Sequence, residues 1–504
     1  FAFLRAYVGR DGKPAAHSPD NVPYKPRMHL RLASRGLGPG DLVFVAGYPG
    51  RTMRLSTADE TAEAVDWFYP KRIRLFEDYL ALIEKLGKED PDVAIKAKPT
   101  ERGLANALTY TKGSLEGLTK GGAADLRKKR EAELKSFIAA DPDRQKRFGE
   151  VLPRLEKHFA ERVKHRELAY ALSEIERMSS LVGAAHTIVR MAEERPKADA
   201  LRKPDLQERN WQRLEQEQQA LEKRYSRKLD SSMLKLALAR ISKHSDENAR
   251  SRVLPVFLGK LEPSEANIDK VVERLYRETK LEDIAARVEL LKKANLTRLR
   301  ASTDPILRLA VELRPLFKAR DDRADAEMGA LASVRPLYVA ALREHAPAPI
   351  APDANGTLRV TYGTVRGYRP KPDAPTYTPF TKLEELVAKV TGKEPFDAPP
   401  RLVELAKSKK FGPYTDQRLG SVPVDFLADL DITGGNSGSP TLNARGELVG
   451  LAFDGNYEAM ASDWVFMPDI TRSIHVDLRF MTWVMDAVDG ADHLLVEMGK
   501  QPAL

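Results

Sequence analysis

The stretch GGNSGSP, residues 434–440, places one candidate nucleophile, Ser437, among three glycines. A serine hydroxyl reacts when a neighbouring base takes its proton, and the oxyanion that results needs preorganised hydrogen-bond donors. Gly435 and Gly438 permit the unusual dihedrals of a tight turn, in which backbone N–H groups can serve as those donors. We therefore interpret Ser437 as a nucleophile, with its own N–H and that of Gly435 forming an oxyanion hole.

The alternative interpretation of the same residues is an ordinary Gly/Ser-rich hairpin loop. The residues that follow favour catalysis, because a short turn in NARGE leads directly into the apolar run LVGLAF, residues 448–453. This order of loop, turn and strand resembles the nucleophile region of trypsin-like serine peptidases.

The composition is that of a globular chain with interspersed charges. The 504 residues are 42% hydrophobic, which is sufficient for two or three domains with their own cores. A net charge of +9 arises from 82 basic and 73 acidic residues mixed along the chain, a pattern typical of solvated helical surfaces, so we expect no nucleic-acid partner. No window reaches the roughly 18 consecutive apolar residues of a membrane span, and we expect no membrane insertion.

Cysteine is absent from the sequence, which excludes disulfides, thiolate chemistry and Cys-ligated zinc in these residues. The sequence also contains no metal-ligand cluster and no phosphate-binding glycine loop. We therefore expect no cofactor and no metal.

The sequence changes character twice along the chain. Residues 1–58 combine apolar runs such as FAFLRAYV and DLVFVAGYPG with turn residues, which predicts strands. Residues 59–345 are rich in Leu, Ala, Glu, Lys and Arg, with apolar residues three and four apart, which predicts helices. After the Pro/Ala-rich linker HAPAPIAPDANG, alternating segments resume within residues 346–504. We predict an α+β protein whose β fold is interrupted by a large inserted α-helical domain.

Two further stretches resemble bacterial trypsin-like peptidases: GDLVFVAGYPG, which opens their second barrel, and FAFLRAY, which follows their catalytic aspartate. The resemblance implies a chymotrypsin-like double β-barrel whose first barrel is incomplete here. The triad of this fold runs His, Asp, Ser, so we expect the acid one residue before Phe1, the base further upstream, and no activity from this chain alone. We interpret seven of the nine histidines as surface or packing residues, namely His17, His29, His158, His165, His186, His244 and His475.

Over essentially its whole length the chain resembles the bacterial dipeptidyl-peptidase 7 and dipeptidyl-peptidase 11 family of chymotrypsin-like serine exopeptidases. The most specific stretches are FAFLRAYV, VAGYPGRTMR, GLANALTYTKG, TGGNSGSPTLNARGELVGLAFDGN and SIHVDLRFMTWVMD. The resemblance implies a serine peptidase that releases dipeptides from the free N terminus of oligopeptides. It also implies a periplasmic or secreted location and a homodimer.

The resemblance assigns roles to three further residues. Asn106 in LANAL and Asp454 in FDGN would bind the substrate ammonium, and an amide oxygen and a carboxylate are suitable acceptors for a desolvated cation. Gly455 stands at the position where family members that cleave after acidic P1 residues, the second substrate residues, carry an arginine. We therefore expect an apolar or bulky P1 preference instead.

Asn436 stands where trypsin relatives activated by cleavage carry an Asp that pairs with the new α-amine. A neutral amide cannot form that ion pair, so we expect an oxyanion hole formed without cleavage.

Two other functions remain open at this point. The first is a trypsin-like endopeptidase in which the helical insertion serves as a docking domain. The second is a catalytically inactive, peptidase-like barrel that acts as a binding scaffold.

Overall fold

The computed structural model describes residues 3–504, which divide into two compact units. One unit is discontinuous and combines the described residues up to Arg54 with Pro352–Leu504, whereas the other is the single segment Leu55–Ala351. The boundaries expected from the sequence lie after residues 58 and 345. The chain is thus a mixed α and β protein with a large helical content, and the strands and the long helices belong to different units.

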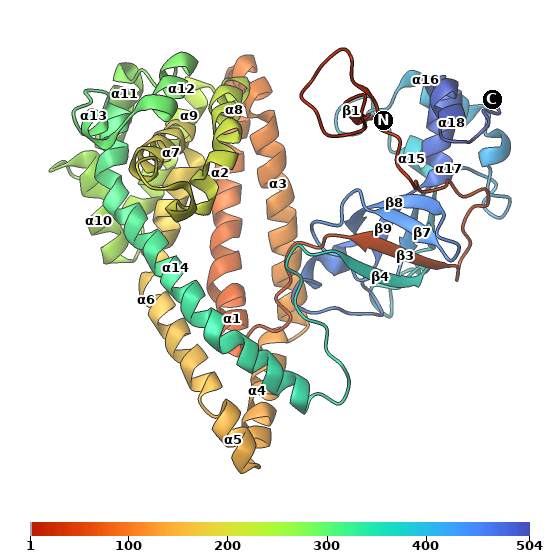
Figure 1. The fold of residues 1–504 in the computed structure, drawn as a ribbon, viewed down its shortest axis with the longest axis horizontal. Helices are drawn as coiled ribbons and strands as arrows, with labels where there is room; N and C mark the ends of the chain where they lie inside the picture. The colour runs from red at the N-terminus through yellow and green to blue at the C-terminus, as the bar shows by residue number, and fades with distance from the viewer. Residues whose placement is uncertain (1–2) are drawn as a thin grey trace. The chain divides into compact units, whose positions relative to one another are not determined.

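The discontinuous unit is built on a seven-stranded antiparallel sheet with the order β4-β3-β7-β8-β9-β6-β5. Strands β3, β4, β7, β8 and β9 are labelled in Figure 1. An isolated bridge between Val365 and Ala428 joins the ends of β4 and β6, so the sheet curls back toward itself. Alternate residues of β3 are buried, including Val43 and Val45, as expected for a strand with one face on a core. The strands are β3 (Leu42–Gly47), β4 (Arg359–Thr364), β5 (Phe380–Lys382), β6 (Pro423–Ala428), β7 (Pro440–Asn443), β8 (Leu448–Gly455) and β9 (Ser473–Asp477).

A second core of the same unit surrounds the fully buried Trp483, whose indole N–H donates to the carbonyl of Lys410 at 3.0 Å. It is formed largely by short helices that follow the strands. These helices are α15 (Leu383–Ala388), α16 (Pro400–Lys407) and α17 (Leu478–Trp483), whereas α18 (Asp492–Glu497) contributes Leu495 to a separate small cluster.

The strand predicted over FAFLRAYV is largely wrong. Only Tyr7–Val8 form a strand, β1, which pairs with the short β2 (Val22–Pro23). Residues 3–6 are irregular and exposed, because they lie outside the two-residue ladder of β1 and β2. The first two residues of the stretch, Phe1 and Ala2, lie outside the described residues.

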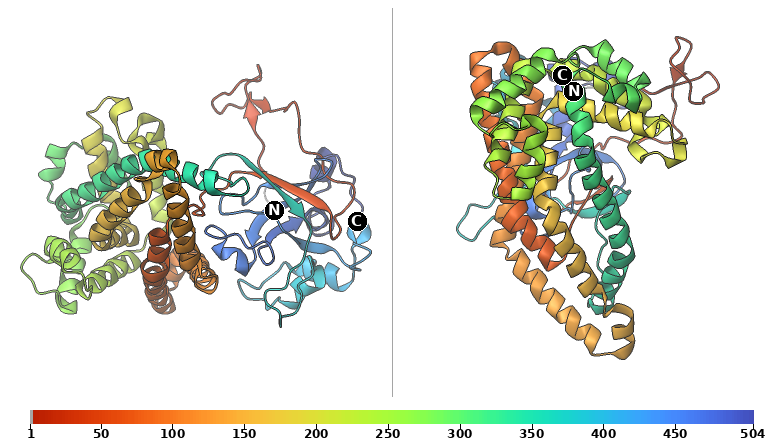
Figure 2. Two further views of the ribbon diagram at one scale, coloured as in Figure 1. Left: turned by 90° about the horizontal axis from the view of Figure 1, so that it is seen from below. Right: turned by 90° about the vertical axis from the view of Figure 1, so that its left-hand side faces the viewer.

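The continuous unit is helical. Two of its long helices begin with strong caps: Asp90 and Asp304 accept hydrogen bonds from the first turns of α3 and α14, each followed by proline at the first helical position. α2 packs along α3, and α6 packs beside α14 (Figure 2). The helices are α1 (Ala58–Glu63), α2 (Tyr69–Glu89), α3 (Pro91–Lys120), α4 (Ala123–Ala139), α5 (Pro142–Phe148), α6 (Val151–Met178), α7 (Ser180–Glu194), α8 (Trp211–Ala220), α9 (Arg227–Ser242), α10 (Glu247–Leu258), α11 (Glu265–Glu278), α12 (Ile284–Lys293), α13 (Leu296–Arg300) and α14 (Pro305–His345).

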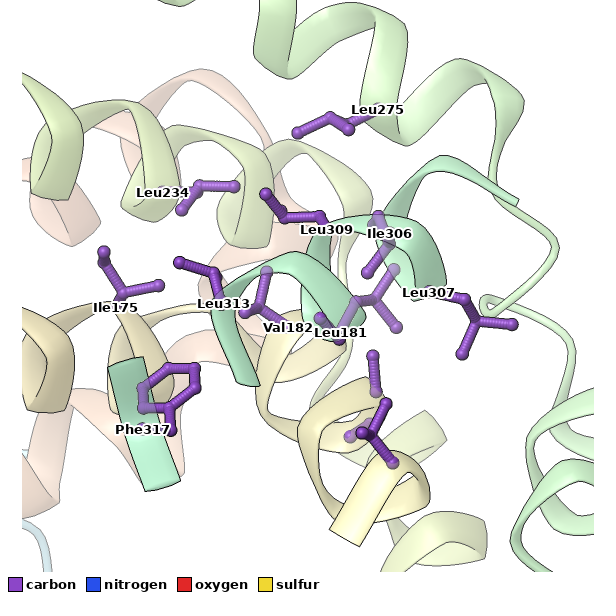
Figure 3. Close-up of a cluster of buried hydrophobic side chains, with 14 of the residues drawn as sticks. Ile175, Leu181, Val182, Leu234, Leu275, Ile306, Leu307, Leu309, Leu313 and Phe317 are labelled. Atoms are coloured by element: carbon purple, nitrogen blue, oxygen red, sulfur yellow. The ribbon is translucent and has the colours of Figure 1, made fainter. Parts of the chain in front are cut away.

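The main core of the helical unit lies where α6, α7, α9, α11 and α14 meet (Figure 3). Ile175, Val182, Leu234, Leu313 and Phe317 are among its buried side chains. The sequence pattern predicted helices in this unit, because apolar residues recur three and four positions apart. No helix in the described part of the chain is long and apolar enough to cross a membrane.

Candidate active site

Ser437 lies in the loop that connects β6 to β7, and its side chain is exposed. Its Oγ is 3.5 Å from the carbonyl oxygen of Phe453 in β8, which is too long for a strong O–H···O hydrogen bond. The hydroxyl is therefore free to react with a ligand that approaches this loop.

The backbone N–H groups of the loop divide into engaged and free donors. Those of Asn436, Gly438 and Ser439 donate to the carbonyls of Thr433, Ala452 and Asn436 at 2.7–3.1 Å. By contrast, the N–H groups of Gly435 and Ser437 donate to no carbonyl within residues 3–504. These are the two donors that the sequence predicted for the oxyanion hole.

Gly435 has a conformation and surroundings that only glycine tolerates. Its φ of 109° lies in a region that side-chain-bearing residues rarely adopt. A Cβ at this position would collide with the carbonyl oxygen of Tyr48 and lie 2.8 Å from the amide nitrogen of Gly50. The loop therefore packs directly against Tyr48 and Gly50, which follow β3. The N–H of Gly50 also donates to the carbonyl of Gly434 at 2.7 Å.

Asn436, directly before the serine, points into the protein. It is 3% exposed, and its Nδ2 donates to the carbonyl of Thr433 at 3.1 Å. Gly47 at the end of β3 leaves room for it, since a Cβ there would overlap Asn436 Oδ1. The neutral amide is therefore satisfied inside the loop without a charged partner.

Beneath the loop lies an ionic anchor that sequence reasoning missed. Both terminal nitrogens of Arg54 donate to the carboxylate of Asp431, and Nε donates to the carbonyl of Ser462 at 2.9 Å. Burial lowers the pKa of Arg54, but the hydrogen bonds and charge of Asp431 outweigh it and raise the pKa overall. The Thr433 hydroxyl similarly donates to Asp463. Arg54 lies in the motif VAGYPGRTMR and could have been noticed there. Its partner could not be identified from the sequence, because Asp431 is 377 positions away.

Asp454 and Gly455 end the neighbouring strand β8, directly after the residue whose carbonyl faces Ser437 Oγ. The pairing of β8 with β9 shifts register between Ala452 and Asp454, which is a bulge of the kind found beside many active sites. The Asp454 side chain is exposed, and its Oδ1 accepts from the Gly455 N–H at 2.8 Å. The sheet therefore brings Ser437, Asp454 and Gly455 close together. Asn106 lies on α3 of the helical unit and is exposed.

His475 occupies an interior position on β9. Its Nδ1 and Nε2 form 2.7 Å hydrogen bonds with Thr441 Oγ1 and Ser473 Oγ, and its ring stacks on Phe426. Burial lowers the pKa of His475 to about 3. These contacts confirm a packing role, since both nitrogens are engaged within the core.

Within the discontinuous unit, no histidine is hydrogen-bonded to Ser437. Groups of three His, Asp or Glu side chains able to hold a metal ion are not found among the described residues.

Comparison with known proteins places this loop and sheet in a family. The family model described as peptidase S46 matches residues 1–500. The chain belongs to the peptidase S46 family. An Asp/Glu-specific dipeptidyl-peptidase of Shewanella putrefaciens is 37% identical over 522 residues, which cover 99% of this chain and 70% of that protein. Dipeptidyl-peptidase 7 of Capnocytophaga gingivalis is 30% identical over 99% of this chain and 68% of its own length.

Solved structures of Porphyromonas endodontalis DPP11 share the fold of this chain. The crystal structure of Porphyromonas endodontalis DPP11 in complex with the dipeptide Arg-Glu matches 99% of this chain and 70% of its own, with a TM-score of 0.78 at 26% identity. A second crystal structure of that protein, in an alternate conformation, matches with a TM-score of 0.63. The resemblance inferred from the sequence motifs is thus confirmed, and the chain is similar to dipeptidyl-peptidases.

Proposed function

We propose that the protein is a serine dipeptidyl aminopeptidase that releases dipeptides from the free N terminus of oligopeptides, with Ser437 as its nucleophile. The observation that carries the proposal is the exposed Ser437 hydroxyl beside the backbone N–H groups of Gly435 and Ser437, which donate to no carbonyl in the described residues. The similar proteins named above are dipeptidyl-peptidases. The proposed fold is a chymotrypsin-like double β-barrel of which the curled sheet is the second barrel, in a periplasmic or secreted homodimer.

In the proposed reaction, Ser437 Oγ attacks the carbonyl carbon of the P1 residue while a general base accepts the hydroxyl proton. The oxyanion accepts hydrogen bonds from the Gly435 and Ser437 N–H groups, and one such donor is typically worth a factor of about 10²–10³ in rate. The amine of the remaining peptide leaves with a proton, and water then hydrolyses the dipeptidyl ester.

Asp454 is proposed to accept hydrogen bonds from the substrate ammonium. Its position supports this role, because its carboxylate is exposed and it follows the residue that faces Ser437. Among described residues, no ion pair occupies this carboxylate, whose one hydrogen bond comes from the neighbouring N–H of Gly455. The assignment of Asn106 to the same ammonium stays a prediction.

For P1 we propose an apolar or bulky side chain. The support is Gly455, which offers no cation, and Arg472, whose carbonyl lies 3.6 Å from the place of a Gly455 Cβ. The Arg472 guanidinium is buried and donates to four backbone carbonyls, so it is not free for a substrate carboxylate. The Shewanella putrefaciens relative is named Asp/Glu-specific and the Capnocytophaga gingivalis relative dipeptidyl-peptidase 7, so the test compares both kinds of P1 side chain.

The test compares free and N-acetylated hexapeptides with Leu, Phe or Asp at P1, digested by the full-length protein and analysed by mass spectrometry. We expect dipeptides from the free peptides only, with Leu or Phe preferred. Asp454→Asn should lower kcat/KM for free peptides at least tenfold, whereas the exposed Asp397→Asn should not. Equal cleavage of acetylated peptides would favour an endopeptidase, and no cleavage by the full-length protein would favour an inactive scaffold.

A further inference from the structure

The helical unit contains a cavity of about 790 Å³ whose walls are residues 63–76, α6 and α14. Every residue that lines it belongs to the helical unit. Its volume lies within the range of small-molecule sites, which is about 300–1,000 Å³. The cavity has no part in the chemistry proposed for Ser437.

One wall of the cavity is aromatic and apolar. It includes Trp67, Phe68, Phe76, Tyr170 and Met178. Trp67 and Tyr170 pack edge to face at 5.8 Å between ring centroids. A wall of this kind favours a ligand with an aliphatic or aromatic body, because binding removes apolar surface from water.

The acidic side chains of the cavity already have cationic partners. Glu63 binds Arg162 at 2.6 Å and Arg166 at 3.2 Å. Glu174 accepts from Arg240 Nε at 2.9 Å, and Glu161 accepts from Lys164 at 2.5 Å. Glu327 lies 3.5 Å from Arg162. Because these carboxylates are already paired, they do not neutralise the remaining arginines that line the cavity.

Three lining arginines, Arg72, Arg177 and Arg323, form no ion pair or hydrogen bond in the part of the chain that the structure describes. Arg72 is half-buried and lies over the rings of Phe68 and Phe76, at 5.1 and 5.0 Å from their centroids. Burial lowers the pKa of Arg72, and the positive charge of Arg177 lowers it further. Guanidiniums that line one cavity without an anionic partner are stabilised when an anion binds to them.

We propose that this cavity binds an amphipathic carboxylate, whose charged group is held by Arg72 and Arg177 while its aliphatic or aromatic body packs on the wall of Trp67, Phe68 and Phe76. The guanidinium geometry suits a carboxylate, because the planar fork can donate two parallel hydrogen bonds. Arg323, on α14, supplies further positive charge to the cavity.

The test is isothermal titration calorimetry on the full-length protein with four probes: decanoate, decanamide, 2-naphthoate and 2-naphthamide. Each amide matches its carboxylate in shape but lacks the charge. We expect one site per chain and at least tenfold tighter binding of the carboxylate in the preferred pair. Preference for decanoate over 2-naphthoate would identify an aliphatic body, and the reverse an aromatic one.

Variants locate the binding site. Arg72→Gln and, separately, Arg177→Gln should weaken carboxylate binding about tenfold or more, whereas Arg209→Gln, an exposed arginine elsewhere in the helical unit, should leave it unchanged. Ala169→Phe, which narrows the cavity without altering charge, should weaken binding of carboxylate and amide alike. Circular dichroism melts control for folding. Equal affinity for acid and amide, or full affinity in both arginine variants, would overturn the proposal.

Discussion

The substitution Gly435→Ala tests whether the loop conformation itself creates the oxyanion hole. At φ 109°, an alanine would carry about 1–3 kcal/mol of backbone strain, and its Cβ would also collide with the Tyr48 carbonyl. The loop must shift to relieve both, which displaces one of the two free N–H donors. Loss of one such donor corresponds to about 10²–10³ in kcat, or roughly 3–4 kcal/mol.

The chain offers a matched control one residue earlier. Gly434 has no positive φ, and a Cβ added there would meet nothing within 4 Å. We therefore expect Gly434→Ala to keep kcat within about twofold, while Gly435→Ala loses at least 10² with little change in KM. The assay is hydrolysis of an unblocked dipeptidyl coumarylamide by the full-length enzyme, with urea unfolding to confirm that both variants fold. A Gly435→Ala enzyme with kcat within threefold of wild type would refute the reasoning.

Two further predictions follow from the sheet around Ser437. Gly455→Arg should shift P1 preference toward Asp and Glu in competition assays. The new Cβ would lie 3.0 Å from Ala459 Cβ, so the double variant with Ala459→Gly should show a larger shift. An unchanged preference in both variants would count against the P1 assignment. His475 is neutral in the folded protein, since burial lowers its pKa to about 3, whereas the unfolded chain takes up the proton near pH 6.5. Its contribution to stability is therefore complete above pH 6.5 and is lost as the pH falls from there toward 3, by about 1.4 kcal/mol per pH unit. Urea unfolding at pH 7.5 and 4.5 should show wild type losing about 2–3 kcal/mol more than His475→Gln; parallel losses would contradict this.

Much of the fold could be predicted because local pattern and tertiary environment agree. The alternation in DLVFVAG became β3, and the apolar run before Asp454 became β8. Helical spacing identified the inserted domain, and α14 ends at His345, where the Pro/Ala-rich linker begins. The prediction for FAFLRAYV failed because a strand needs a partner as well as a pattern, and within residues 3–8 only Tyr7–Val8 pair with another strand.

The serine loop was recognisable from local residues, but its supports were not. Gly435, Asn436 and Ser437 are consecutive, so their glycine-rich context was visible in the sequence. The pair Arg54 and Asp431 is separated by 377 positions and leaves no local pattern. The unpaired Arg72 could not be inferred either, because the absence of a partner is a property of the folded cavity.

The most direct test of the central claim is peptide mapping by mass spectrometry after the active full-length enzyme has reacted with a fluorophosphonate, which forms a stable adduct with an activated serine. The account predicts one adduct, on Ser437, formed in parallel with the loss of dipeptidyl-peptidase activity and absent from Ser437→Ala. An adduct on another residue that accompanies inactivation, or full sensitivity of the Ser437→Ala protein, would contradict it.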